Sequence, residues 1–246
     1  MTHVALCPSE IRRLSDTDLG GSTAVVFDVL RATSSMITGL SVGVAEIYPV
    51  KTVEEARAWK MKDPDLVLAG ERGGLPLEGF DIGNSPYEFE SLSGKRVVMT
   101  TTNGTVSIQL VRNAATVLIG SLLNIDSLAE HLSQKRPPVL LLVCAGTGEE
   151  FSLEDAIAAG ALVSRLRERD DLTDAALSVK SLYERFEDHL EEWLFQTENA
   201  RQLEKLGKGS DVHRCAQLSV YDVIGVLRNS AVVALRDNAI QGGLQC

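Results

Sequence analysis

The sequence of 246 residues holds few cysteines and few aromatic residues, the latter making up 5% of the chain. The four cysteines are Cys7, Cys144, Cys215 and Cys246; they form no CxxC pair, and their spacing suggests no disulfide. A chain of this length can bury a core without disulfide staples. We therefore expect a protein of a reducing compartment, the cytoplasm.

Long apolar runs and basic clusters are also lacking. No stretch approaches the roughly 20 apolar residues that a membrane helix needs. The start, MTHVALCPSE, has neither a basic nor an apolar signal region. A net charge of -10 argues against a nucleic-acid partner, because phosphate backbones favour clustered Lys and Arg. We expect no membrane partner either, and a small anionic substrate would need a local basic pocket or a divalent cation.

Several catalytic signatures are missing. No GxGxxG or GxxxxGK[ST] occurs, and the four histidines show no metal-ligand spacing. Residues 39–43, GLSVG, match GxSxG but follow a predicted helix, whereas a nucleophile elbow follows a strand. A thiol-phosphatase loop would need Arg six residues after Cys144, where Glu150 stands. Dinucleotide, P-loop, serine-hydrolase and thiol-phosphatase chemistry are therefore disfavoured.

Alternation of short apolar strands with helices dominates the first two thirds of the chain. The predicted strands are 4–6, 24–27, 45–50, 66–69, 97–99, 117–119 and 139–143. The predicted helices are 32–40, 53–61, 106–113, one from 124 or 126 to about 134, and 153–167. Capping boxes are expected at Thr52 to Glu55 and at Ser152 to Asp155. This alternation predicts a three-layer α/β/α fold with a mixed or largely parallel sheet.

The remaining segments fit a single domain over residues 1–246. Residues 70–94 hold six glycines but also scattered apolar residues, which predicts an ordered loop over the sheet edge. About 170–218 reads as a helical segment packed on the domain, and one strand returns at 220–227. The helical segment has one apolar face with helical spacing, which suits either core packing or a homodimer. This face consists of Leu182, Phe186, Leu190, Trp193 and Leu194.

The stretch TAVVFDVLRAT, residues 23–33, organises the candidate site. Its unalternating apolar strand delivers Asp28 and Arg31 to the carboxyl end of the sheet, where ligands bind in open α/β folds. The alternative is that Asp28 caps the following helix and Arg31 pairs with it. Aspartyl-phosphate phosphatases also carry an Asp here, but the second acid expected two residues later is Leu30.

Two further polar loops should meet this strand end: Cys144 to Gly148, and Thr100 to Thr105. The TTTNGT loop offers free amides at a helix start, hydroxyl donors and a glycine, which together suit an oxyanion. The alternative is that Thr105 caps its own helix and the rest forms a tight turn.

Two arginines and five carboxylates are available for charge. Arg31 and Arg72 could clamp an anion bidentately. The acids that could hold a hard divalent cation such as Mg²⁺ are Asp28, Glu71, Asp81, Glu154 and Asp155. Glu154 and Asp155 could instead stabilise a helix dipole, and Glu71 could form a solvated pair with Arg72.

Six motifs in order carry a family resemblance: FDVLRATSS, GERGG, EGFDIGNSP, TTTNGT, CAGTG with FSLEDAIAAGALV, and CAQL. From about residue 24 to 227 the chain resembles the 2-phosphosulfolactate phosphatase family of coenzyme M biosynthesis. The resemblance implies a magnesium-dependent phosphatase of three-layered α/β architecture that acts on a small phosphorylated sulfonate acid.

The matching positions imply site residues, which we divide by inferred role. The catalytic set is Asp28, Arg31, Glu71 and Arg72; the substrate-binding set is Asn84, Ser85, Thr101, Thr102, Asn103, Gly104, Thr105, Cys144 and Gly146; and the metal set is Asp28, Glu71, Glu154 and Asp155. Attack by a metal-activated water is the preferred mechanism. A covalent role for Asp28 ranks second, given Leu30.

Two positions depart from the family pattern. Residues 197–200, Thr-Glu-Asn-Ala, replace a Ser-x-His-Gly stretch, and Ser219 stands where an acid is expected after CAQL. These changes leave two alternatives open. One is a protein that binds an anion without turnover, and the other is a phosphatase of another small phosphorylated acid.

Overall fold

The computed structural model describes residues 1–167 and 171–235. Cys246 and position 170, where the predicted helical segment begins, lie outside the described residues. Within the described part, no helix is both long enough and apolar enough to cross a membrane. The cytoplasmic location and the homodimer stay predictions.

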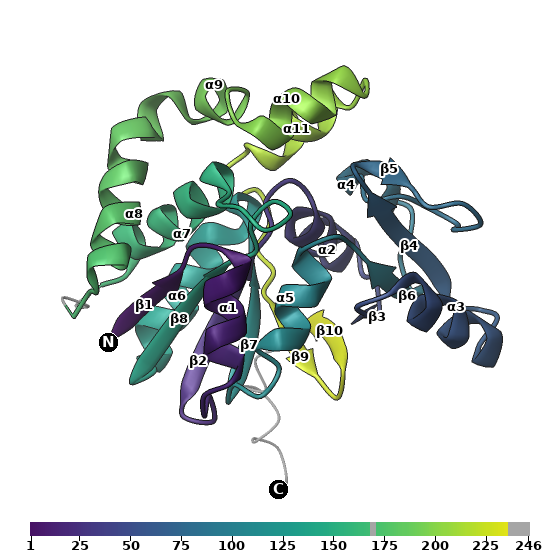
Figure 1. Cartoon of the computed structure of the whole chain (residues 1–246), viewed down its shortest axis with the longest axis horizontal. Helices are drawn as coiled ribbons and strands as arrows, with labels where there is room; N and C mark the ends of the chain where they lie inside the picture. Colours follow the sequence, from purple (N-terminus) through teal and green to yellow (C-terminus); the bar gives the residue numbers. More distant parts are fainter. Residues whose placement is uncertain (168–170, 236–246) are drawn as a thin grey trace, which may run out of the picture.

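The strands build one sheet of ten in the order β1-β8-β2-β7-β9-β10-β3-β6-β4-β5 (Figure 1). They run over Thr2–Ala5 (β1), Ser22–Phe27 (β2), Glu46–Pro49 (β3), Val67–Arg72 (β4), Leu75–Pro76 (β5), Arg96–Thr100 (β6), Thr116–Gly120 (β7), Val139–Cys144 (β8), Gly225–Arg228 (β9) and Ala231–Ala234 (β10). The predicted mixed or largely parallel sheet is confirmed, and β1 is an edge strand as expected.

The sheet has two parallel parts joined by an antiparallel hairpin. Strands β1, β8, β2 and β7 pair in parallel, as do β3, β6 and β4. The hairpin β9–β10 lies between them and pairs antiparallel with both. Three antiparallel steps reverse the second part relative to the first. The loops after β6 and β8 nevertheless meet, because Asn103 Nδ2 donates to Ala145 O at 2.9 Å.

The hairpin corrects the prediction of one strand at 220–227. Two strands occur here, and they are joined by a two-residue turn at Asn229 and Ser230 with φ of 49° and 74°. Positive φ at both central residues matches the right-handed twist of the flanking strands. Position 220 itself lies outside β9.

Helices cover both faces of the sheet. They run over Pro8–Ser15 (α1), Ala32–Ser41 (α2), Val53–Lys62 (α3), Pro86–Phe89 (α4), Gly104–Leu110 (α5), Ile125–Lys135 (α6), Leu153–Arg165 (α7), Asp174–Phe186 (α8), Leu190–Leu194 (α9), Glu198–Lys205 (α10) and Gly209–Cys215 (α11), with 3-10 turns at Leu122–Asn124 (η1) and Glu187–His189 (η2). Helix α1 was not predicted from the sequence; its Pro8 suits the first helical turn, and Ile11 is buried.

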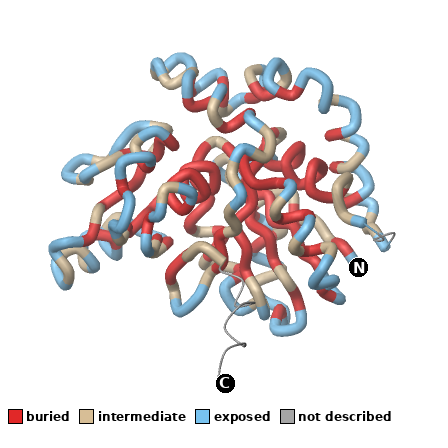
Figure 2. Tube along the Cα trace, turned by 180° about the vertical axis from the view of Figure 1, so that it is seen from behind, coloured by how far each residue is buried: buried red, intermediate tan, exposed pale blue. Residues whose placement is uncertain are grey.

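Side-chain alternation along β2 shows how the layers form. Val25 and Phe27 pack with α6, α7 and α8, whereas Ala24 and Val26 pack with α1, α2 and α5. In Figure 2 the buried parts of the trace lie in the middle of the molecule and the exposed parts at its periphery. These contacts confirm the predicted three layers and give β2 an environment that is apolar on both faces.

Helices α9, α10 and α11, residues 190–215, lie over the upper end of the sheet in Figure 1 and are here named the cap. The apolar face predicted in this region is divided between α8 and α9, with η2 between them. Leu190 and Leu194 are buried, and the Phe186 and Trp193 rings stack with centroids 4.2 Å apart. The segment 70–94 is ordered as expected: β4 extends to Arg72, followed by β5 and α4.

Candidate active site

A cavity of about 240 Å³ lies between the strand-end loops and the cap. Its lining comes from the end of β4, from the loops after β2, β4, β6 and β8, from the segment before α4 and from α10, and comprises Asp28, Leu30, Arg31, Glu71, Gly73, Gly74, Asn84, Thr102, Asn103, Gly146, Thr147, Gly148, Asn199, Gln202 and Leu203. The three polar loops singled out in the sequence thus contribute to one cavity. Larger hollows occur elsewhere, but they are lined by surface side chains remote from these loops.

Asp28 lies at the end of β2, against the starts of two helices. Its Oδ1 accepts a hydrogen bond from Ala32 N at 3.2 Å, as a helix-capping acid would. A Cβ on Gly104 would lie 2.5 Å from Asp28 Oδ2, so only glycine lets α5 begin this close to the carboxylate. The carboxylate is fixed by backbone on two sides while it lines the cavity.

Arg31 pairs with the cap and not with Asp28. Its Nη1 lies 2.5 Å from Asp211 Oδ2 on α11, and its Nη2 donates to Gly74 O at 2.8 Å. Asp211 Oδ1 accepts from Ser85 Oγ at 2.7 Å. Arg31 and Asp211 are each 3% exposed, so this is a buried ion pair that is hydrogen-bonded on both sides.

Glu71 faces the cavity, whereas Arg72 points elsewhere. Glu71 Oε1 accepts from Thr102 N and Oγ1 at 2.9 and 3.0 Å, and Oε2 accepts from Gly74 N at 2.9 Å. Arg72 donates to the Glu71 carbonyl and to Thr100 Oγ1 and does not line the cavity. Successive strand residues face opposite sides, which explains why the two separate.

The TTTNGT loop uses most of its donors within the protein. Thr101 and Thr105 bond reciprocally, each backbone amide donating to the other hydroxyl at 3.0–3.1 Å. Asn103 Nδ2 donates to the Ala145 and Gly148 carbonyls, and Asn103 Oδ1 accepts from Gly148 N. This loop, which follows β6, is therefore hydrogen-bonded to the loop after β8. Thr102 and Asn103 also line the cavity.

The capping box expected at Ser152 does not form, and Asp155 bonds to other loops. Ser152 makes no side-chain cap, and its hydroxyl has no partner among the described residues. Asp155 instead accepts from Val29 N at 2.8 Å and from Gly146 N at 3.1 Å. The carboxylate thus fastens the loops after β2 and β8 together, a long-range role that outweighs the local cap. By contrast, Thr52 does cap α3 as predicted, accepting from its own helix.

The other predicted residues lie around or below the cavity. Asn84 lines it, and Asn84 Oδ1 is buried without a hydrogen-bond partner within the described residues. Cys144 is fully buried beneath the loop, and burial raises the pKa of its thiol well above the usual range. Glu154 is buried and accepts from Asn199 Nδ2 at 2.6 Å. Asp81 bonds Lys60 and Leu68 N away from the cavity.

Crowded carboxylates dominate the electrostatics. Burial raises the pKa of Asp28 to about 7, and the charges of Glu71 and Glu154 add to the rise, while the amides of Ala32 and Gly104 oppose it. Burial and the charges of Asp28 and Glu154 likewise raise the pKa of Asp155 well above its ordinary value. The Arg31 charge, already paired with Asp211, does not offset this excess of negative charge.

Comparison with known proteins identifies the family. The model of the 2-phosphosulpholactate phosphatase family matches residues 9–230. The chain belongs to this family. A relative from Thermotoga petrophila, named probable 2-phosphosulfolactate phosphatase, is 42% identical over 86% of this chain and 91% of its own length. Relatives of the same name from Caldicellulosiruptor saccharolyticus and Clostridium acetobutylicum are 39% and 35% identical over 91% and 89% of this chain and 96% and 95% of theirs.

The predicted family and the enzyme class, a phosphoric monoester hydrolase, are thereby confirmed. Within this 2-phosphosulfolactate phosphatase fold, the cavity also contains residues that sequence reasoning did not select: Leu30, Gly73, Thr147, Gly148, Gln202 and Leu203 in its wall, with Asp211 behind Arg31. The GERGG and CAGTG motifs pointed to the loop residues. Gln202, Leu203 and Asp211 gave no local signal, because they reach this region only through the tertiary packing of α10 and α11. Asn199, which the sequence marks as a departure from the family pattern, also lines the cavity.

Oxygen donors in the cavity of this family member suit a hard cation. Asp28 and Glu71 line the same cavity, and magnesium typically takes one or two carboxylates with waters and substrate phosphate. No cluster of three or more His, Cys, Asp or Glu side chains with metal-binding geometry occurs in residues 1–167 and 171–235. Asp28 and Glu71 would therefore be the carboxylates available to such an ion.

Proposed function

We propose that the chain hydrolyses the phosphate ester of 2-phosphosulfolactate to sulfolactate and phosphate, with Mg²⁺ as cofactor. The observation that carries the proposal is the shared cavity of Asp28, Glu71 and Arg31, in a chain of the 2-phosphosulpholactate phosphatase family. The names of the relatives support the substrate. The proposal of Mg²⁺ as cofactor is supported by the oxygen donors in the cavity and by the uncompensated negative charge of its carboxylates.

Charge explains why cation and anion would bind together. A substrate with three anionic groups would be repelled by Asp28, Glu71 and Glu154 unless a cation came between them. Asp28 has its pKa raised to about 7 by burial first and then by its acidic neighbours, so a cation here would favour its ionised form. Arg31 supplies a fixed positive charge at the same cavity. Substrate affinity should therefore depend on the metal.

The residues that line the cavity would have different roles in this reaction. Asp28 and Glu71 would hold the cation, which, when bound, offsets phosphate charge and lowers the pKa of water. Arg31 would bind an anionic group of the substrate through N–H groups not used by Asp211 and Gly74. A carboxylate of the cavity would orient the attacking water and take its proton. The bond from phosphorus to the ester oxygen breaks, and that oxygen gains a proton to become the hydroxyl of sulfolactate.

The deciding experiment is phosphate release from 2-phosphosulfolactate by the wild type and by Asp28→Asn, each with magnesium and with chelator. Asp222→Asn is the matched control, because Asp222 is an exposed acid that only accepts from Ser127 Oγ. We expect the control to equal the wild type, and turnover to be lost in Asp28→Asn and in all chelated samples.

Two outcomes would contradict the proposal. No release from the wild type with magnesium would refute this substrate, and a panel of phosphorylated three-carbon acids would then identify any other. Full activity in chelator would refute the cofactor. An acid-stable phosphate adduct on wild-type enzyme, absent from Asp28→Asn, would replace water attack by a covalent role for Asp28.

A further inference from the structure

Arg31 is held from the side that faces the cap. Its two bonds, to Asp211 and to Gly74 O, use two of the five N–H groups of the guanidinium. Among the described residues no acceptor takes the other three. Since Arg31 also lines the cavity, these N–H groups are available to a ligand there.

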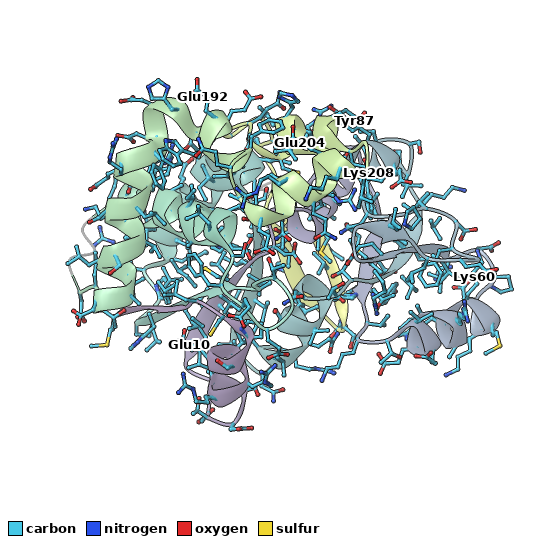
Figure 3. All side chains as sticks on the ribbon, turned by 45° about the horizontal axis from the view of Figure 1, so that its top comes forward. Glu10, Lys60, Tyr87, Glu192, Glu204 and Lys208 are labelled. Atoms are coloured by element: carbon cyan, nitrogen blue, oxygen red, sulfur yellow. The ribbon has the colours of Figure 1, made fainter. Side chains whose placement is uncertain are left out.

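Both partners of Arg31 depend on the cap. Asp211 belongs to α11 directly. The turn at Gly73 and Gly74 is held by α10, because Gln202 Nε2 donates to Gly73 O at 3.1 Å and the Leu206 side chain lies against Gly74. The Tyr87 hydroxyl also donates to Ser210 O of α11 at 3.5 Å. Figure 3 shows Tyr87 at the rim of the cap, near Glu204 and Lys208 in that view.

We propose that Asp211 is a positioning residue that keeps the Arg31 guanidinium available to the anionic substrate, an inference that rests on the proposed function. Without a partner on the cap side, Arg31 would be attracted to the carboxylates of Asp28 and Glu71 in the same cavity wall. Such a pairing would leave Arg31 unable to bind the anionic substrate, and Asp28 and Glu71 unable to bind the metal ion. Asp211 prevents it by competing from the opposite side.

Asp211→Asn is the informative change, because it keeps the shape and the bond from Ser85 but removes the charge. Mutation of a residue that orients a metal ligand typically costs about 10- to 100-fold in affinity or activity, and we take the same range for a residue that orients an anion-binding arginine. We therefore expect the affinity for inorganic phosphate, measured by calorimetry with magnesium, to fall by that factor. Asp211→Glu, which keeps the charge, should recover part of the loss.

The matched control is Glu90→Gln. Glu90 Oε1 accepts from Arg214 Nη2 at 2.6 Å, so this ion pair also ties α11 to its neighbours, but it lies outside the cavity wall. A purely structural role of Asp211 predicts that both variants lower the melting temperature and leave phosphate affinity and KM unchanged. A positioning role predicts that only Asp211→Asn weakens phosphate binding and raises KM more than it lowers kcat.

A double variant protects the test from misfolding, since Arg31→Gln with Asp211→Asn leaves no unpaired buried charge. If Asp211 acts through Arg31, the double variant binds phosphate as Arg31→Gln alone does. Additive losses, wild-type affinity in Asp211→Asn, or no phosphate binding by the wild type would each overturn the proposal. Failure of the proposed substrate would instead leave phosphate binding intact and abolish only turnover.

Discussion

Replacing Asp28 by asparagine should make the stability of the metal-free protein less dependent on pH. The pKa of Asp28 is raised from 3.8 to about 7, chiefly by burial and then by Glu71 and Glu154. The folded state therefore holds a proton that the unfolded chain releases. The contribution of Asp28 to stability is fully present below pH 3.8 and is lost as the pH rises toward 7.

The magnitude follows from the same shift. At about 1.4 kcal/mol per pH unit, Asp28 alone removes about 2–3 kcal/mol of unfolding free energy between pH 5 and pH 8. For a protein of this size that corresponds to a fall in melting temperature of about 5–10 °C. In Asp28→Asn this part of the fall should vanish. The change should also weaken the remaining pH dependence, because the Asp28 charge contributes to the raised pKa of Asp155.

The assay is thermal unfolding by circular dichroism in chelator at pH 5, 6, 7 and 8. The wild type is compared with Asp28→Asn and with the exposed control Asp222→Asn, which should follow the wild type. Equal falls in melting temperature for the wild type and Asp28→Asn would refute the claim that Asp28 is an abnormally basic buried acid.

Three further changes test the cavity. Magnesium affinity should rise with pH up to about 7, with proton release in calorimetry, because Asp28 must ionise to bind; equal affinity at pH 5.5 and 8 would contradict this. Gly104→Ala places a Cβ 2.5 Å from Asp28 Oδ2 and should lower kcat/KM by about 10- to 100-fold, while Gly21→Ala, with no atom within 4 Å, should not. Asn199→Asp replaces a donor to Glu154 by a like charge, so its melting temperature at pH 8 should fall by several degrees; an unchanged value would argue against this contact.

Sequence reasoning located the part of the site that comes from strand ends. Asp28 follows a buried strand, Glu71 lies at the end of β4 in the glycine-rich GERGG motif, and Asn103 stands in the polar loop after β6, so local patterns were sufficient to select them. Local patterns could not show that Arg72 and Glu71 face opposite sides of β4. They also could not show that the Asp155 carboxylate accepts hydrogen bonds from Val29 N and Gly146 N.

The cap and the middle of the sheet were beyond such reasoning. Asp211 lies on a short helix, and the sequence of that helix gives no sign of what it contacts. Only tertiary packing places Asp211 behind Arg31. The β9–β10 hairpin turns at Asn229 and Ser230, without the glycine that usually marks a two-residue turn. Its place between β7 and β3 depends on contacts more than 100 residues distant in sequence.

The inserted hairpin has a consequence for the order in which the protein can assemble. Strands β7 and β3 are completed early in synthesis, but the hairpin that joins them is made after every other element of the sheet. Until then, a nascent chain carries two half-sheets with open edges, which are templates for wrong pairing. Formation of this last long-range contact should be slow, because its loop-closure entropy must be overcome first. A chaperone that shields strand edges during translation would thus raise the yield of active enzyme.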